Sequence, residues 1–455
     1  MQREPGFLAA TLLLLASGAC APTVQLERPP VLQSQAWRGI EGSGTTISGN
    51  LAAMLGMEEL RRLTALALAG NSGLGIAKAR IAQSRALLHA ARKATLPRVS
   101  ASAGASRKFN LGGGNPLDFT NSFGSLDIAL DLDLFGRLGA AKRSAAARAR
   151  VAELQHDAVV LAVEGSVAEA FVQRAGIAQR IAILENSIVR ASELERVIKL
   201  RFDAGDANRV DLGLQTIQRM NLRSDRSRLA QALEQTRTAL AILTGAEAPQ
   251  FESAAASLDA MAVPQLLAPP PPTLLAARPD VRAAEAAIEA ANGDVAQARA
   301  NFFPVVSLSA SGLLESAVGG ALGRSVNLAS SVLAPIFSQG RLQSEFRFAS
   351  AAQAESVERY RLAIVTALAE VEDIRSAVAA SGERASLLDL IVAEARLTAR
   401  LANMQYIEGE EGLQALLNAE QWLSDAEEAQ ALSRQERLFA QIALYRAMGG
   451  SSAPR

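Results

Sequence analysis

A strict alternation of apolar and polar residues marks one short stretch of the chain. From Leu126 to Leu134 the sequence reads LDIALDLDL, with Leu or Ile at every second position. Successive side chains of a β-strand point to opposite faces, so this stretch predicts a strand with one apolar and one acidic face. Asp127, Asp131 and Asp133 fall on the acidic face. A strand with lipid on one side and a water-filled pore on the other has this pattern.

Three further stretches carry weaker forms of the same signal. Pro304–Gly312 alternates apolar residues with serine, and Val99–Lys108 and Val326–Leu333 are less regular. The predicted strands form two pairs, at 98–135 and 304–337. Four strands cannot close a membrane barrel, since the smallest have eight, and an open sheet edge in lipid leaves backbone groups unpaired. If these strands enter a membrane, several chains must combine their strands.

Long helical patterns without proline fill most of the remaining chain. No proline occurs between Pro116 and Pro249, or between Pro335 and Pro454. A helix over Gly139–Leu200 would be roughly 90 Å long, whereas helices of globular proteins average about 11–12 residues. These runs therefore predict coiled-coil or tunnel-wall helices. No run of 18 or more apolar residues follows the N-terminal segment, so we expect no transmembrane helix.

The two halves of the chain repeat each other. The helical pattern that ends at Pro97 returns at Pro304, 207 residues later, and RFDAG ending at Gly205 returns as QYIEG ending at Gly409, 204 residues later. This indicates a tandem duplication of a helix, a strand pair, a long helix, a turn and a helix. We expect a signal peptide at 1–19, an N-terminal arm at 20–56, a first copy at 57–252, a proline-rich linker at 253–272, a second copy at 273–450 and a tail at 451–455.

Composition argues against several classes of function. The 46 basic and 46 acidic residues balance, so there is no electrostatic footprint for nucleic acid. With two histidines and one cysteine, a zinc site or a Ser-His-Asp triad is not expected. The strand aspartates could in principle be metal ligands or glycosidase acids, but their spacing on one strand face favours pore lining. We expect no enzyme activity and no metal or cofactor.

The N-terminus predicts export. The apolar run Phe7–Leu15 is too short to span a bilayer and is followed by small residues up to Cys20, as in a signal peptide. The only cysteine of the chain stands where a lipoprotein signal is cleaved and lipidated. Ser17 occupies a position where such signals usually carry Leu, and Ala19-Cys20-Ala21 also offers an ordinary signal-peptidase site. We expect lipidation of Cys20, with the lipid anchoring the mature chain to the outer membrane.

Together these stretches resemble the TolC-like outer-membrane efflux proteins, in particular the lipoprotein branch that serves resistance-nodulation-division pumps. The resemblance is carried by Cys20, DLDLFGRL at 131–138, RFDAG at 201–205, RPD at 278–280, PIFSQGRL at 335–342 and the MGG that ends at Gly450. It implies a mainly α fold with a small membrane β part. Three chains with four strands each would form a twelve-stranded barrel in the outer membrane of a Gram-negative bacterium, on a long α-helical tunnel across the periplasm.

The resemblance also implies partners and site residues. The partners are two further copies in a homotrimer, outer-membrane lipid, a periplasmic adaptor (membrane fusion) protein and an inner-membrane pump. Arg201, Gly205, Tyr406 and Gly409 would form the periplasmic tips where the adaptor docks, although a glycine between helices is also an ordinary C-terminal cap. Asp211 is a gate candidate.

The second copy departs from the family's gate pattern. The family carries aspartates six and nine positions after the second-copy glycine, where this chain has Ala415 and Asn418. An acidic ring from the second copy is therefore not expected, and Asp211 supplies the acid six positions after the first-copy glycine.

The expected function is a passive exit duct for small molecules that a pump and an adaptor deliver. Two alternatives remain open: a channel for type I protein secretion, and a periplasmic coiled-coil scaffold lipoprotein without a pore. The paired helices fit the scaffold, whereas the alternating strands in both copies do not. The sequence does not identify the cargo.

Overall fold

The computed structural model describes residues 37, 51–108, 119–254, 256–317 and 323–450, which fall into two compact units. The described part of the first lies in Ala79–Leu154 and Arg282–Ala363; that of the second lies in Leu32–Lys78, Gln155–Val281 and Ile364–Arg455. The predicted signal peptide, Cys20, the tail and most of the arm lie outside the described residues.

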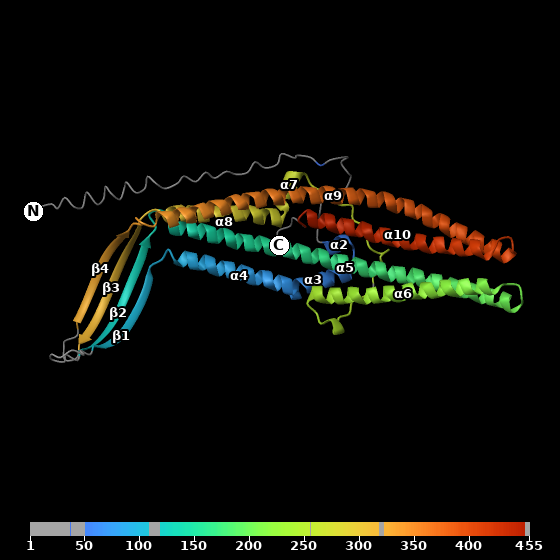
Figure 1. The fold of residues 1–455 in the computed structure, drawn as a ribbon, viewed down its shortest axis with the longest axis horizontal. Coiled ribbons are helices and arrows are strands. Elements are labelled where there is room, and N and C mark those ends of the chain that lie inside the picture. Colours follow the sequence, from blue (N-terminus) through green and yellow to red (C-terminus); the bar gives the residue numbers. More distant parts are fainter. Residues whose placement is uncertain (1–36, 38–50, 109–118, 255, 318–322, 451–455) are drawn as a thin grey trace, which may run out of the picture. The chain divides into compact units, whose positions relative to one another are not determined.

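A four-stranded antiparallel sheet belongs to the first unit (Figure 1). Its strands are β1 (Arg98–Lys108), β2 (Phe119–Leu132), β3 (Val305–Ala317) and β4 (Gly323–Leu333), and their order in the sheet follows the sequence. Both predicted strand pairs are confirmed. The β2–β3 pairing joins the strands of the two copies into one sheet.

The sheet has two chemically different faces. Asp127 of β2 pairs with Ser100 of β1 and Ser311 of β3, so polar residues meet across the strands. The opposite face carries apolar side chains that are largely exposed in the single chain: Val99 (64%), Leu126 (51%), Val326 (82%) and Leu328 (78%). The predicted two-faced strand is confirmed, and at these positions its two faces continue onto β1, β3 and β4.

One boundary of this prediction is wrong. Strand β2 ends at Leu132, two residues before the predicted end at Leu134. Asp133 therefore lies beyond the strand, where its carboxylate accepts hydrogen bonds from the backbone N–H groups of Leu138 (2.9 Å) and Gly139 (2.7 Å). These unpaired N–H groups at the start of the next helix bind the carboxylate more favourably than water does.

Helices of the first unit pack through small residues. The unit contains most of α4 (Ser72–Lys93) and α8 (Pro279–Ala300) and the beginnings of α5 (Arg137–Asp203) and α9 (Gln339–Glu408). A Cβ on Gly293 of α8 would lie 2.8 Å from the backbone N of Ser144 in α5. The Ser144 hydroxyl donates to Asp294 (2.7 Å), which also pairs with Arg148 (2.5 Å). Glycine is required here because the two helix backbones approach closely.

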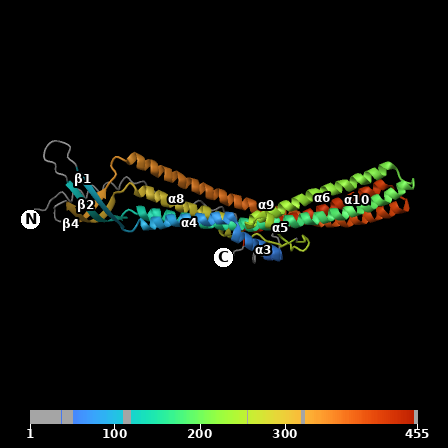
Figure 2. The same cartoon turned by 90° about the horizontal axis from the view of Figure 1, so that it is seen from below.

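The second unit holds two helical hairpins (Figure 2). Helices α5 and α9 continue into it and pair with α6 (Arg209–Thr244) and α10 (Leu413–Ala447). The 67 residues of α5 and 70 of α9 correspond to roughly 100 Å each. The long helix predicted over Gly139–Leu200 is therefore confirmed and extends further at both ends.

Shorter elements complete the second unit. They are α2 (Leu51–Met54), α3 (Glu58–Gly70), η2 (Ala248–Gln250) and α7 (Pro271–Ala277). Phe171, Leu240, Leu274, Leu438 and Tyr445 are fully buried in a core that these elements share with α5, α6 and α10. The helical pattern that ends at Pro97 is present as α3 and α4, which are interrupted at Asn71.

The segment predicted as a linker belongs to this core. Leu258, Met261 and Leu266 are buried, and the Arg434 guanidinium holds the segment by donating to the backbone oxygens of Leu258 (3.0 Å) and Met261 (3.1 Å). Helix α7 begins at Pro271, inside the predicted linker range. Proline is favoured in the first turn of a helix because it lacks only an N–H that would be unpaired there.

The duplication is visible as two matching joints. The Asn71 amide donates to the Leu243 carbonyl (2.8 Å), and the Arg278 guanidinium donates to the Ala447 carbonyl (3.1 Å). Asn71 and Arg278 are 207 residues apart, and the two carbonyls are 204 residues apart. The duplicated copies therefore share this contact although the donor differs.

Backbone crowding repeats at the same joints. A Cβ on Gly245 would lie 2.1 Å from the Gly70 carbonyl oxygen, and one on Gly449 would lie 3.0 Å from the Ala277 carbonyl oxygen. Both glycines also have positive φ (72° and 84°).

None of the helices in the described part of the chain is long and apolar enough to cross a bilayer.

Candidate functional site

The two hairpins turn with the same backbone geometry. Gly205 follows α5 with φ of 85°, and Gly409 follows α9 with φ of 80°. The next residue in each turn donates its N–H back into the helix, from Asp206 to the Arg201 carbonyl (2.8 Å) and from Glu410 to the Gln405 carbonyl (2.9 Å). This bond pattern with a left-handed glycine is a Schellman cap. Apart from the adjoining residues, no atom of the described chain lies within 4 Å of a Cβ built on either glycine, so backbone conformation and not crowding selects glycine.

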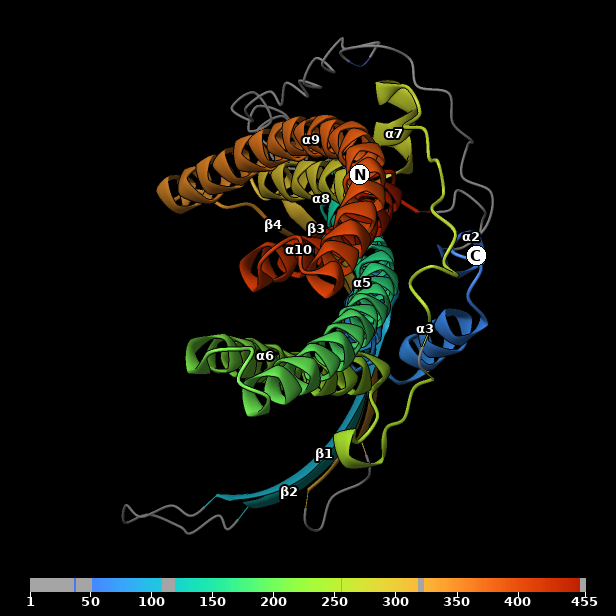
Figure 3. The same cartoon turned by 90° about the vertical axis from the view of Figure 1, so that its right-hand side faces the viewer.

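Predicted tip residues from both copies contact each other. The guanidinium carbon of Arg201, in the last turn of α5, lies 4.6 Å from the centre of the Tyr406 ring in α9. Tyr406 is 7% exposed and packs with Ala402, Leu416 and Leu423. This is a cation–π geometry. The sequence predicted both residues at hairpin ends but gave no signal that they touch. Figure 3 looks onto the hairpin ends and shows α5 with α6 and α9 with α10 as two pairs.

Asp211 lies in the first turn of α6. The Asn208 side chain caps this helix by accepting from the Asp211 N–H (2.9 Å). Among the described residues the Asp211 carboxylate has no hydrogen bond or ion pair, and its side chain is half-buried. A carboxylate near a helix N-terminus is favoured by the helix dipole, so this placement alone does not assign it to a gate.

The start of α10 differs from that of α6. Gly412 occupies its N-cap position and offers no side-chain cap. Asn418 accepts from Gln414 of the same helix (3.0 Å), and Ala415 carries no polar group. The two hairpins therefore have matching turns but different helix starts.

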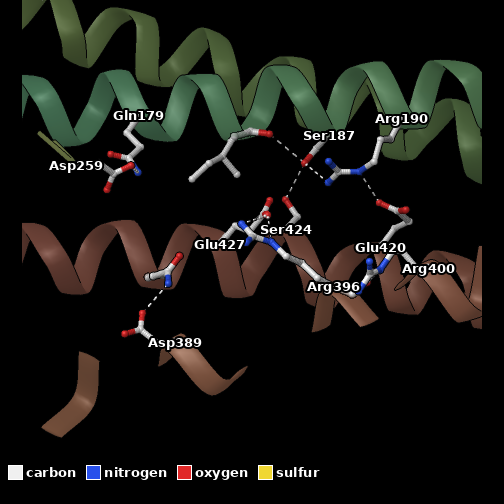
Figure 4. Close-up of polar contacts among 12 residues, drawn as sticks. Gln179, Ser187, Arg190, Asp259, Asp389, Arg396, Arg400, Glu420, Ser424 and Glu427 are labelled. Atoms are coloured by element: carbon white, nitrogen blue, oxygen red, sulfur yellow. Dashed lines mark hydrogen bonds and ion pairs between the residues drawn. The ribbon is translucent and has the colours of Figure 1, made fainter. Parts of the chain in front are cut away.

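A series of polar contacts joins α5 to α10 (Figure 4). Arg190 pairs with Glu420 (2.7 Å), and the hydroxyls of Ser187 and Ser424 lie 3.3 Å apart. Both serines are buried, so their hydroxyls are shielded from water. These residues were not singled out in the sequence, because their periodicity does not show which helix faces which.

A second group of contacts joins the partners within each hairpin. Glu195 of α5 accepts from Arg219 and from Thr216 of α6 (2.8 Å). The hydrogen bond from Arg219 lowers the pKa of Glu195 below its usual range, and it outweighs the opposite effect of burial. In the other hairpin Arg396 of α9 pairs with Glu427 of α10 (2.8 Å).

The three strand aspartates have different environments. Asp127 accepts from the Ser125 hydroxyl (2.7 Å), and Asp133 caps α5 as described above. Asp131 accepts from Ser307 (2.9 Å) and has Arg98 and Arg137 within 3.7 Å and 3.6 Å. Two guanidinium groups therefore offset the charge of Asp131, so the negative field that pore-lining carboxylates would create is weaker than three free aspartates would give.

The Arg278 of the RPD motif is buried in the second unit. It is 7% exposed and binds Asp280 through two nitrogens (3.0 and 2.7 Å) and Glu370 through one (2.8 Å). Burial raises the pKa of Asp280, but the Arg278 hydrogen bond and charge outweigh it, so the pKa lies below its usual range. This site stabilises the joint between the second-copy helices, because its donors and acceptors satisfy one another.

Among the described residues, no group of three His, Cys, Asp or Glu side chains could hold a metal ion. The polar residues described above pair helices with helices or cap them. What they form is a set of contacts between helices and at helix ends.

Comparisons with known proteins agree with this description. Residues 63–246 and 271–450 match the family model described as outer membrane efflux protein. The pyoverdine export outer membrane protein OpmQ of Pseudomonas aeruginosa is 30% identical over 460 residues, covering 97% of this chain and 96% of the relative. The cation efflux system protein CusC of Escherichia coli is 26% identical, covering 86% of each chain.

Solved structures show the same architecture. The outer-membrane channel OprN superposes with a TM-score of 0.87 at 25% identity, covering 95% of this chain and 99% of that one. The open state of the Neisseria gonorrhoeae MtrE outer membrane channel gives a TM-score of 0.84 at 26% identity, covering 95% and 98%. Both likenesses extend over the sheet and the helical hairpins.

Proposed function

Because the chain belongs to the outer membrane efflux protein family, we propose that it forms the passive exit duct of a tripartite efflux system. In this assembly three copies form the channel, a periplasmic adaptor docks on its helical hairpins, and an inner-membrane pump supplies the transport energy. The chain itself contributes a wall, a gate and docking surfaces.

The observation that carries this proposal is the two-faced sheet. Its apolar face is exposed in the single chain, with Val326 and Leu328 at 82% and 78%. A face of this kind is stable against lipid, and the polar face is stable against water. Strands β1 and β4 are the sheet edges and have unpaired backbone groups on their outer sides. Closing the sheet with further copies removes both edges, and three copies give twelve strands.

The hairpin turns support the docking role. Gly205 and Gly409 give both hairpins the same turn, and Arg201 contacts Tyr406 between them. We propose that these four residues form the periplasmic tip, that the adaptor binds there, and that the Arg201–Tyr406 contact helps to keep the tip closed. Asp211 lies on the adjacent helix start and is the gate acid in this proposal.

A lipid on the N-terminus would attach the chain to the membrane in addition to the sheet. We propose that Cys20 is lipidated and that the lipid holds the N-terminus at the outer membrane. Replacement of Cys20 by Ala is expected to abolish labelling with radioactive palmitate. If the sheet alone holds the chain in the membrane, the unlabelled variant will still fractionate with the outer membrane.

The identity of the cargo is not implied by the relatives. Their names include export of pyoverdine, toluene and cations, which are chemically unlike one another. A duct that accepts what a pump delivers is compatible with this range. On the polar face Arg98 and Arg137 offset the charge of Asp131, so this carboxylate does not by itself favour cations among these cargoes.

A matched pair of substitutions on β4 tests the duct. Leu328→Arg places a charge on the apolar face, and Asn327→Arg places the same charge one residue away on the polar face. Arginine facing lipid costs about 2–4 kcal/mol at mid-depth. We expect Leu328→Arg to abolish the outer-membrane trimer on detergent extraction and sizing, whereas Asn327→Arg should leave it intact. A periplasmic monomer from the unmodified chain would instead identify a scaffold lipoprotein.

Pump dependence separates efflux from protein secretion. In a host that lacks its own duct, the chain should restore resistance to small toxic compounds only together with an adaptor and a resistance-nodulation-division pump. Restored secretion of a type I protein substrate, without such resistance, would assign the chain to the other system.

A further inference from the structure

A cavity of about 480 Å³ lies between the two hairpins of the second unit. Helices α5, α6, α9 and α10 all contribute to its wall. Much of the wall is apolar, and Ala191, Leu222 and Leu416 there are each at most 8% exposed. Small-molecule sites have volumes of roughly 300–1,000 Å³ and mainly apolar walls with a few polar groups. The cavity therefore has the size and lining of such a site.

A buried side-chain oxygen in this wall has no partner among the described residues. Gln215 of α6 is 1% exposed, and its side-chain nitrogen donates to the Ala191 carbonyl (2.7 Å). Its side-chain oxygen is buried and accepts no hydrogen bond from any described residue. Buried acceptors are almost always paired, and leaving one unpaired is costly. A donor brought by a ligand would satisfy this oxygen.

Two pairs of polar side chains in the wall already satisfy one another. Arg190 binds Glu420, and Ser187 lies within hydrogen-bond distance of Ser424. The opposite charges of Arg190 and Glu420 offset each other, so this pair offers a ligand no net charge to bind. The buried, unpaired group that the cavity offers a ligand is the oxygen of Gln215, and the rest of the recognition is mainly apolar contact.

We propose that this cavity binds an amphipathic small molecule with an apolar body and a single N–H or O–H donor directed at Gln215. A molecule in this position contacts both hairpins at once. Tyr406 also lines the cavity and carries the Arg201 contact, so an occupant would change how firmly the hairpin turns hold together. The site goes beyond the duct function, since binding here does not require passage through a pore.

Fluorescent probes of matched structure test the proposal. N-phenyl-1-naphthylamine has an apolar body and one N–H, and its N-methyl derivative lacks that donor. The chain has only Trp37 and Trp422, and Trp422 lies on α10 between the wall residues Glu420 and Ser424. In full-length Trp37→Phe protein in lipid nanodiscs, energy transfer from Trp422 reports probe near the cavity, with empty nanodiscs subtracted.

We expect saturable energy transfer with the N–H probe. The dissociation constant of the N-methyl probe should be about threefold to tenfold higher, because one hydrogen bond is lost. In Gln215→Leu the two probes should bind equally. Leu222→Phe, which fills the cavity, should weaken both probes at least tenfold, whereas Leu214→Phe on the exposed side of α6 should not. Trimer size and thermal unfolding verify that each variant is folded.

Either of two results overturns the proposal. The first is equal binding of both probes to the unmodified cavity. This comparison uses no substitution in the cavity, so it is valid even if a cavity variant does not fold. The second is unchanged binding of both probes in folded Leu222→Phe protein. If that variant also loses pump-dependent resistance, the cavity is instead assigned to a helix of a partner protein.

Discussion

The guanidinium of Arg201 lies 4.6 Å from the centre of the Tyr406 ring, so the last turns of α5 and α9 touch. The two residues come from different copies of the duplicated unit and end different hairpins. A contact between hairpins at this place has to break if the hairpins are to separate there. In the proposed duct, its strength would form part of the balance between a closed and an open tip.

Removing the ring should open the tip. In Tyr406→Leu the cation–π contact is lost, at a cost of about 0.5–1 kcal/mol per chain, whereas Tyr406→Phe keeps a ring over which Arg201 can lie. We expect higher basal conductance for the Leu variant in planar lipid bilayers and a value near the original for the Phe variant. Equal conductance of all three proteins would remove this contact from the closing mechanism.

The turn glycines should tolerate no side chain. Gly205 and Gly409 have positive φ, a conformation that costs other residues roughly 1–2 kcal/mol each. Gly205→Ala and Gly409→Ala are expected to lower the thermal unfolding temperature and to increase proteolysis at the turns. Gly213→Ala is the control, because this glycine lies within α6 with nothing near its Cβ. There alanine should stabilise by roughly 0.5–1 kcal/mol, and destabilisation there would contradict the argument.

The contact between α5 and α6 should weaken in acid. The pKa of Glu195 is lowered in the folded chain by the Arg219 hydrogen bond, so the folded state favours the carboxylate. Its stabilising effect is complete above the unfolded-state pKa of about 4.3 and is lost as pH falls through the lower folded-state pKa. The protection of α6 amides, measured relative to their intrinsic exchange rates at each pH, should fall as the pH falls through this range in the unmodified protein.

Glu195→Gln provides the comparison. It should raise hydrogen exchange of the α5–α6 contact at neutral pH and remove this part of the dependence on pH. A pH profile that is the same with glutamine would show that other carboxylates govern the loss of stability.

The buried guanidinium at the second joint should be needed for stability. Arg278→Met leaves the carboxylates of Asp280 and Glu370 and the Ala447 carbonyl without their donor. Since both carboxylates are 47% exposed, water compensates in part, and we expect a loss of about 1–3 kcal/mol in chemical denaturation. The exposed Arg282 is the control, and Arg282→Met should change stability by less than about 0.5 kcal/mol.

Sequence patterns predicted the elements better than their contacts. The alternation around Asp127 identified a strand because side chains on a sheet repeat every two residues, and the proline-free runs identified α5 and α9. The end of β2 was missed because Asp133 continues the alternation in sequence while its carboxylate caps the following helix. Local pattern does not distinguish these two uses of one aspartate.

The contacts between helices needed the structure. Arg190 and Glu420 are 230 residues apart, and nothing in the helical period of either segment shows that they face each other. The same holds for the buried Leu258 in a segment whose prolines predicted a linker. Tertiary packing, which brings distant residues together, decides both cases.

The crowded joints of the duplicated copies have a mechanical consequence. At Gly245 the end of α6 lies so close to the Gly70 carbonyl that a Cβ there would clash, so this end is fixed by its neighbour. The 36 residues of α6 make an arm of about 54 Å, along which a tilt of about 5° at the fixed end moves the free end by about 5 Å. A small tilt of α6 at Gly245 therefore produces a large displacement of its other end at the hairpin turn. Contacts of the side chains at the turn determine only how much force this displacement requires.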